Sequence, residues 1–398
     1  MFKRVRYYIF LRDVFVLSLT AFGGPQAHIA LFLERLVNKR GYLSEEDLIE
    51  LNALCQILPG PTSTQTITAI GFKVGGIPLA YLTLLVWALP AVTLLTAAGM
   101  MISVLTEKNL SIEFTKFIQP MAVGFVSYAT YRISSKVVNT NLGIFIMIGS
   151  GVISYFAGSA NNTLLGPFVF PLILIVGGTI TAFKYKTHEK VKKEKFIFNW
   201  NGVILWGGVF LAAILLGNFT PARHILLFEN FYRNGSLIFG GGHVLIPLLF
   251  GEFVTLKEFL SPQEFLSGYA FVQSVPGPTF SFSAYIGALS MRDFGAPGEI
   301  LGSISAVLGI FLPGTFLIFF VIRIWTSLKK YRVIRASLEG ITAASSGMVA
   351  AAAIMMFQPL ENTPLNISLV IGTFCILAFT KIPGPIVIIA GLIAGFII

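Results

Sequence analysis

Charged residues and cysteines are scarce in this chain of 398 residues. Only 12% of the residues are Asp, Glu, Lys or Arg, whereas 55% are hydrophobic. A water-soluble fold of this length could not bury so large an apolar fraction, so the composition predicts an integral membrane protein with the lipid bilayer as its first partner. The two cysteines, Cys55 and Cys375, stand far apart in apolar segments, which argues against a disulfide or a cysteine metal site.

The chain also lacks the short motifs of the common enzyme classes. It contains no GxSxG, no HExxH, no phosphate-binding loop and no paired carboxylates placed for acid–base chemistry. We therefore expect a protein that is not an enzyme and that holds no cofactor and no metal. The first apolar stretch carries Arg12 and Asp13 and has no cleavage site of small residues, so we expect it to remain in the mature protein.

Positive charge is present, with a net value of +10, but it falls into short clusters. These clusters lie at residues 3–6, 184–195 and 329–335, next to apolar segments. Basic loops beside membrane segments face the cytoplasm more often than the outside. The clusters therefore predict cytoplasmic loops and a cytoplasmic N-terminus, and they do not predict contact with nucleic acid.

One pattern occurs twice with a constant spacing of 217 residues. The first copy runs from Phe22-Gly23-Gly24-Pro25 to Gln56-Ile57-Leu58-Pro59-Gly60-Pro61, and the second runs from Phe239-Gly240-Gly241-Gly242 to Gln273-Ser274-Val275-Pro276-Gly277-Pro278. Two half-length copies whose apolar segments are broken by Gly and Pro are typical of secondary transporters with internal repeats.

The apolar segments predict an all-α polytopic membrane protein with about 13 membrane segments, six before the basic linker and seven after it, within a range of 10–14. Six crossings return the chain to the cytoplasm at the linker, so the second repeat enters from the opposite face and is inverted. The Pro-Gly-Pro segments could be broken crossings or re-entrant hairpins, and we prefer broken crossings. The expected divisions are a first repeat at 1–183, a basic cytoplasmic linker at 184–199, a connecting membrane segment at 200–230 and a second repeat at 231–398.

The Pro-Gly-Pro breaks predict a site for an anion. A helix that restarts after Pro61 exposes unpaired backbone N–H groups and the positive end of its dipole, and hydroxyl side chains follow directly. The same argument applies to the Gly-rich breaks and to the second repeat. The predicted substrate-binding residues are Gly23, Gly24, Pro25, His28, Gln56, Pro59, Gly60, Pro61, Thr62, Ser63, Thr64, Gln65 and Lys73 in the first half, and Gly240, Gly241, Gly242, His243, Gln273, Pro276, Gly277, Pro278, Thr279 and Ser281 in the second.

Three ionisable residues near these breaks have two interpretations each. His28 and His243 could carry a coupling proton, or they could be neutral imidazoles held by hydrogen bonds. Lys73 could line the substrate path, or its side chain could extend to the cytoplasmic interface. Proton coupling therefore stays open at this point.

These residues resemble the chromate ion transporter family over essentially the whole chain. The first-half likeness lies in Phe22-Gly23-Gly24-Pro25, Gly41-Tyr42-Leu43-Ser44 and Gln56 to Pro61, and the second-half likeness lies in Gly240 to Gly242, 244–249 and Gln273 to Pro278. The resemblance implies a bacterial inner-membrane carrier that exports chromate, with sulfate as a competing oxyanion. Thr62 stands where members of the family often carry Asn, and His243 stands where Tyr is common, so these two positions bear on oxyanion preference.

We therefore expect chromate efflux by a secondary transporter, and with it chromate resistance. Moving one charge through about 100 mV is worth ~2.3 kcal/mol, so a dianion that leaves a negative interior gains about 4.6 kcal/mol. Membrane potential, proton exchange or both could drive export. The alternatives are a transporter of sulfate or another small solute and an anion-selective channel. The sequence also leaves open whether the protein forms a homodimer.

Overall fold

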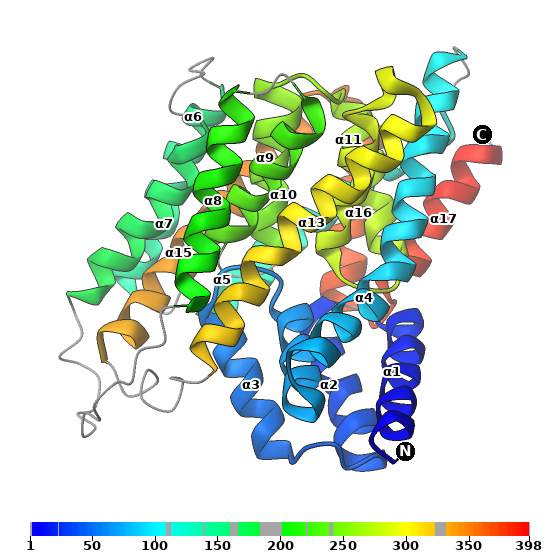
Figure 1. Cartoon of the computed structure of the whole chain (residues 1–398). Coiled ribbons are helices and arrows are strands. Elements are labelled where there is room, and N and C mark those ends of the chain that lie inside the picture. Colours follow the sequence, from blue (N-terminus) through cyan, green and yellow to red (C-terminus); the bar gives the residue numbers. More distant parts are fainter. Residues whose placement is uncertain are drawn as a thin grey trace. The chain divides into compact units, whose positions relative to one another are not determined.

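The structure is a computed structural model that describes residues 2–22, 24–108, 113–137, 140–159, 166–183, 201–219, 222–238, 242–322 and 332–397. Every regular element in these ranges is a helix (Figure 1). The chain divides into two compact units, one formed by residues 1–104, 198–236 and 271–323 and the other by 105–197, 237–270 and 324–398. Each unit draws on both sequence repeats, so the units do not coincide with the repeats. The linker expected at 184–199 lies outside the described residues.

The first unit contains the segments that carry the repeated motifs. Its helices are α1 (Phe2–Thr20), α2 (Gly24–Phe32), the π-helix η1 (Leu33–Lys39), α3 (Glu45–Ile57), α4 (Thr62–Glu107), α8 (Asn201–Phe219), α9 (Arg223–Leu237), the 3-10 turn η5 (Thr279–Ser281), α12 (Phe282–Leu289), η6 (Arg292–Phe294) and α13 (Gly295–Val321). The breaks predicted near residues 23 and 59–61 separate α1 from α2 and α3 from α4, which confirms them.

Helices α3 and α4 meet at Pro59-Gly60-Pro61 and form a hairpin. A capping box of Ser44 and Asp47 begins α3. Lys73 Nζ lies 2.5 Å from Asp47 Oδ1, and its hydrogen bond holds the pKa of Asp47 below the usual value. Asp47 and Lys73, each 13 residues from Gly60, are therefore neighbours, and the two helices run antiparallel. Our preference for a broken crossing is wrong here: Gly60, with φ of 116°, turns the chain back on itself.

A second reversal divides α4 itself. Gly75 and Gly76 have non-helical dihedral angles, and Gly76 has φ of 75° and ψ of −167°. The indole Nε1 of Trp87 donates a hydrogen bond of 3.3 Å to Thr64 Oγ1, although 23 residues of straight helix would span about 35 Å. Residues 62–74 and 77–107 therefore pack as two antiparallel helices. Only the second of them is long enough to cross a membrane.

Helices α1 and α2 form another hairpin, whose tip lies at residues 21–24. The side chain of Asp13 is 1% exposed and pairs with Arg35 at 2.7 Å and with Arg40 at 2.8 Å. The hydroxyl of Tyr42 donates to the same carboxylate at 3.0 Å. A buried carboxylate requires this degree of pairing, and the ion pairs fix the base of the hairpin far from its tip.

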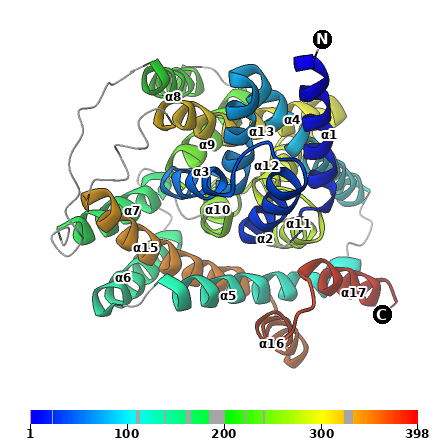
Figure 2. The same ribbon diagram turned by 90° about the horizontal axis from the view of Figure 1, so that it is seen from below.

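The second unit is a bundle of apolar helices. It contains η2 (Glu113–Thr115), α5 (Ile118–Val137), α6 (Asn141–Ser159), α7 (Gly166–Ala182), α10 (Gly242–Phe250), the π-helix η4 (Gly251–Leu256), most of α11 (Pro262–Ser274), α15 (Arg332–Phe357), α16 (Pro364–Phe379) and α17 (Gly384–Ile397). Helix α15 lies along α6 and α7, and α16 lies along α5 (Figure 2).

Glycines set the close packing around α15. A Cβ at Gly347 would collide with the Met147 carbonyl of α6, and one at Gly340 would collide with the Gly177 carbonyl of α7. Small residues at such crossings are the usual means by which membrane helices approach each other, because lipid provides no hydrophobic drive for association.

Length and composition make three described helices candidates to cross a membrane: Thr62–Glu107, Arg292–Val321 and Glu339–Phe357. Seven shorter apolar helices of 10–17 residues accompany them in the described part of the chain. Large apolar side chains such as Phe145, Phe183 and Phe219 are 75–83% exposed on these helices. An all-α chain with such exposed apolar surface is expected in lipid.

Candidate substrate site at the helix tips

The start of α4 is the centre of the candidate site. Pro61 precedes the helix, and its carbonyl accepts the first helical hydrogen bond, from Gln65 N at 2.8 Å. The backbone N–H groups of Thr62, Ser63 and Thr64 come before this bond and so have no carbonyl within the helix. They point out of the positive end of the helix dipole, which is the arrangement that binds anions.

Ser63 is tied to His28 of α2. The two side chains are 3.0 Å apart, Ser63 Oγ to His28 Nδ1, and both are buried. The other ring nitrogen, Nε2, lies 3.1 Å from the carbonyl O of Ala21, which can only accept. Nε2 therefore carries the proton, and in the neutral ring Nδ1 accepts from Ser63. The ring also contacts Trp87 edge-on, with centroids 5.3 Å apart.

The second Pro-Gly-Pro segment reaches the same place. The backbone N–H of Gly277 donates to the Ala21 carbonyl at 2.9 Å, so that one oxygen accepts from both Gly277 and His28. Gly277 has φ of 118°, close to the 116° of Gly60. The rings of Phe271 and Tyr285, on opposite sides of this break, are 6.4 Å apart, which makes it a second hairpin tip.

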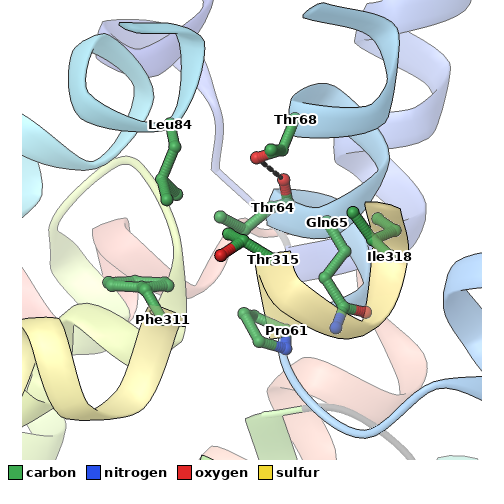
Figure 3. A pocket seen from close by; sticks show the side chains of 8 residues that line it. All are labelled: Pro61, Thr64, Gln65, Thr68, Leu84, Phe311, Thr315 and Ile318. Atoms are coloured by element: carbon green, nitrogen blue, oxygen red, sulfur yellow. Dashed lines mark hydrogen bonds between the residues drawn. The ribbon is translucent and has the colours of Figure 1, made fainter. Parts of the chain in front are cut away.

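A small pocket lies beside the start of α4, between the two halves of α4 and α13 (Figure 3). About 10 Å³ is open to a water-sized sphere, which is the room that one water molecule needs. The structure therefore holds the site in a contracted form, and any larger ligand requires α13 or the second half of α4 to move. The lining residues are Pro61, Thr64, Gln65, Thr68, Leu84, Phe311, Thr315 and Ile318.

The pocket has no charged lining residue, and apolar side chains line it together with four uncharged polar ones. Gln65 is 3% exposed, and its Nε2 donates to the Pro59 carbonyl at 2.6 Å. Thr64 accepts from Trp87, which leaves its own hydroxyl proton free to donate to a ligand. The pocket lining contains no Asp, Glu, Lys or Arg. Selectivity at this site therefore depends on hydrogen bonds and the helix dipole.

The matching positions of the second repeat differ. With the spacing of 217, Thr64 corresponds to Ser281, Gln65 to Phe282 and Thr68 to Tyr285. Phe282 and Tyr285 are fully buried, and their rings stack with centroids 5.8 Å apart. Aromatic side chains thus fill the place that is polar at the first tip, and the two repeats contribute unequally.

Other predicted site residues take varied positions. Gly24 begins α2 with φ of 78°. Gln56 is exposed, and Lys73 is 44% exposed at the base of the hairpin, where it pairs with Asp47 rather than with the tip. In the second repeat, three predicted residues are half-buried: Gln273, Pro276 and Thr279. Pro278 and Ser281 are buried, and the hydroxyl of Ser281 has no hydrogen-bond partner among the described residues. Gly23, Gly240 and Gly241 lie outside the described residues, as do the side chains of Pro25 and His243, whereas Gly242 begins α10.

Several lining residues were not predicted from the sequence. Trp87, Thr315 and Phe311 stand far from the repeated motifs along the chain, and α4 and α13 bring them to the tip. The available signal was an aromatic or polar side chain close to a proline within an apolar segment, Pro90 for Trp87 and Pro313 for Thr315. Within the described residues no group of three or more His, Cys, Asp or Glu could hold a metal ion.

The helical fold, the paired hairpin tips and the exposed apolar helices define a polytopic α-helical membrane protein of the transporter class. A family model described as "Chromate transporter" matches residues 9–183 and 225–396. The chain belongs to this chromate transporter family, and the two matched ranges agree with two repeats.

Curated relatives match along nearly the full chain. A probable chromate transport protein of Synechococcus elongatus is 25% identical over 386 residues, which cover 96% of this chain and 93% of the relative. A chromate transport protein of Pseudomonas aeruginosa is 24% identical over 402 residues, with coverage of 96% and 90%. An uncharacterized transporter of Methanocaldococcus jannaschii is 24% identical over 387 residues, with coverage of 96% and 92%. No solved structure matches the chain.

Proposed function

We propose that this protein exports chromate, or a closely similar tetrahedral oxyanion, across the inner membrane by alternating access. The observation that carries the proposal is the tip of the α3–α4 hairpin. There, the start of α4, whose first backbone N–H groups have no carbonyl within the helix, adjoins a buried pocket that Thr64 and Gln65 line and that has no charged side chain. Membership of the chromate transporter family and the names of the relatives support the choice of oxyanion.

The contracted pocket fits a carrier better than an open pore. About 10 Å³ cannot hold a tetrahedral oxyanion, so the site has to open before it binds. Hairpins joined to crossing helices by glycine reversals allow one part to rock against another. The Pro-Gly-Pro tips of both repeats lie at the site. Each access state would expose the site to one side of the membrane.

Charge and topology support export as the direction. We place the N-terminus in the cytoplasm. If the α1–α2 and α3–α4 hairpins each return to their own side, then residues 77–107, α5, α6 and α7 make four crossings before residue 184. An even number keeps the basic segment 184–199 on the cytoplasmic side, in line with the positive-inside rule. Export of an anion from a negative interior gains about 2.3 kcal/mol per charge at 100 mV.

Flux measurements test the proposal. Purified protein in inside-out vesicles receives radiolabelled chromate or sulfate, with membrane potential and pH gradient clamped separately. We expect saturable chromate uptake that follows potential, pH or both and that sulfate inhibits. Absence of chromate flux under every clamp would refute the proposal.

A pair of variants links this flux to the tip. Gly60→Leu places a side chain at φ of 116°, where the Cβ would come within 2.8 Å of Gln65 Nε2, and it should abolish flux without loss of membrane insertion. Gly207→Leu on α8 is the matched control, because no atom lies within 4 Å of its Cβ position. Full activity of the Gly60 variant would remove the tip from the mechanism.

A further inference from the structure

The polar atoms left free in the pocket beside α4 are mainly acceptors. Gln65 Nε2 donates to the Pro59 carbonyl. Because a carbonyl can only accept, this bond identifies the nitrogen of the amide, and the opposite atom is the oxygen Oε1. Oε1 is buried and has no hydrogen-bond partner among the described residues. Burial of an acceptor without a partner costs roughly 1–3 kcal/mol of stability, so a ligand that donates a hydrogen bond to this atom is favoured.

The two threonines opposite Gln65 also present lone pairs. Thr68 donates its hydroxyl proton to the Thr64 carbonyl at 2.7 Å, and Thr315 donates its proton to the Leu312 carbonyl at 2.8 Å. Since the proton of Thr315 is used in this way, Tyr81 is the donor in the 3.3 Å contact between their hydroxyls. Each threonine oxygen can then accept from a ligand but not donate to it.

A fully deprotonated oxyanion does not satisfy such a lining. All its oxygens are acceptors, so it cannot donate a hydrogen bond to Gln65 Oε1. The lone pairs of the two oxygens would repel, and Oε1 would stay without a partner. A monoprotonated oxyanion has one O–H to donate and three oxygens to accept. Such a species brings a donor for Oε1 of Gln65 and three oxygens for the donors of the site, of which the hydroxyl of Thr64 lines the pocket.

We propose that the substrate occupies this pocket as the protonated monoanion, with its O–H donated to Oε1 of Gln65. The inference rests on the proposed function and names the form of the substrate. The oxyanion takes its proton from water before binding and returns it to water after release, so each transported oxyanion carries one proton and one negative charge in the same direction. Chromate is partly protonated near neutral pH and sulfate is not, which gives the site a reason to distinguish the two.

Two titratable groups stand close enough to confuse a pH profile. His28 is bonded to Ser63, next to the start of α4, and Tyr81 is bonded to Thr315 on α13. The lining residues from α4 and α13 bring no carboxylate, lysine or arginine to the pocket. An ordinary phenol titrates near about pH 10, so substrate protonation and His28 are the two sources of pH dependence near neutral pH that an experiment has to separate.

The test uses the full-length protein in proteoliposomes, with pH equal on both sides, potential clamped, and tracer flux recorded together with current. We expect one charge per chromate and a subsaturating rate that follows the monoanion, falling about tenfold per pH unit once the dianion predominates. His28→Gln should keep this slope. Two charges per chromate, a rate that follows the dianion, or loss of the slope in His28→Gln would overturn the proposal, whereas failure of chromate flux at every pH would instead refute the proposed function.

Competing anions and a Gln65 variant test the hydrogen bond itself. Perchlorate is a tetrahedral monoanion without an O–H and should inhibit weakly, whereas dihydrogen phosphate, which carries O–H groups, should inhibit strongly. Gln65→Met should lower chromate flux about tenfold and remove the difference between the two inhibitors, while Gln119→Met on α5 should preserve both. Equal inhibition of the native protein by perchlorate and dihydrogen phosphate, or an unchanged difference in Gln65→Met, would contradict the proposal.

Discussion

The backbone N–H of Gly277 donates a 2.9 Å hydrogen bond to the carbonyl O of Ala21, so the hairpin tip of the second repeat is joined to the first tip of the first repeat. A reciprocal pair of contacts surrounds this bond. The Cβ position of Gly277 lies 3.0 Å from Ala91, and that of Gly60 lies 3.8 Å from the Cα of Gly314. Ala91 follows Pro90 in α4, and Gly314 follows Pro313 in α13. Each tip therefore rests on a proline-containing helix of the other repeat, as expected for inverted repeats.

This contact predicts the effect of a methyl group at the second tip. Gly277→Ala adds strain at φ of 118° and presses a Cβ against Ala91 at 3.0 Å. We expect a loss of stability of at least about 1–2 kcal/mol from the backbone alone and a clear loss of flux. Ala91→Gly in the same protein should restore part of the flux, because it removes the Cβ of Ala91 that the new methyl group would contact.

Gly24→Ala is the control for this prediction. Gly24 also has a positive φ, 78°, but nothing lies within 4 Å of its Cβ position. Ala91→Gly should therefore give no rescue of Gly24→Ala. Thermal unfolding in detergent and chromate flux are measured for all five proteins, and equal rescue in both backgrounds would argue against the contact between Gly277 and Ala91.

The ion pair of Asp47 with Lys73 predicts a cross-link that separates a hairpin from a broken crossing. With both native cysteines replaced by alanine, Asp47→Cys and Lys73→Cys should be joined by a short bis-maleimide reagent. In one continuous crossing helix these positions would be about 39 Å apart and no link would form. The readout is a mass shift of the peptide pair after proteolysis.

Gln56→Cys with Lys73→Cys is the matched control for the cross-link. Gln56 lies next to the hairpin tip, and Lys73 lies at its base. The hairpin predicts efficient linking of the 47–73 pair and little linking of the 56–73 pair. The reverse order would mean that α3 and α4 do not run antiparallel.

The second unit offers a prediction about packing in lipid. Gly347→Leu on α15 would drive a side chain into the Met147 carbonyl and the Ser150 hydroxyl of α6. Because backbone lies in the way, the helices must separate, and we expect low yield of folded protein. Gly149→Leu on α6 has nothing within 4 Å of its Cβ position and should express normally. Size-exclusion profiles in detergent compare the two, and normal profiles for both would contradict the close approach.

The repeat and the helix breaks were predictable because Gly and Pro act locally. Pro59-Gly60-Pro61 cannot continue a helix in any context, so its role as a break follows from the residues alone. The direction of the chain after the break was not predictable, because it depends on tertiary contacts such as that of Lys73 with Asp47. The sequence argument assumed one crossing and so missed the hairpin.

The polar centre of the site was likewise only partly predictable. Ser63, Thr64 and Gln65 follow the break directly and were predicted, as was His28. Trp87 lies in the second half of α4, whose approach depends on the reversal at Gly76, and Thr315 lies on α13. That reversal was not recognised, although Gly76-Ile77-Pro78 and Gly295-Ala296-Pro297 share a pattern. Their spacing of 219 departs from the 217 of the motifs, which conceals the match.

The matched reversals at Gly76 and Gly295 give the last prediction. Gly76 has φ of 75° and ψ of −167°, and Gly295 has φ of 67° and ψ of −172°. This region of backbone space is essentially restricted to glycine and costs other residues about 1–3 kcal/mol. Gly76→Ala and Gly295→Ala should therefore destabilise the protein by similar amounts and slow transport, since each reversal joins a half-length helix to a crossing helix. Gly372→Ala, in the interior of α16 with nothing within 4 Å, should be neutral or slightly stabilising. Thermal unfolding midpoints and chromate flux in the same vesicles test this prediction. A large loss of stability and flux in one variant and none in the other would show that the two reversals are not equivalent.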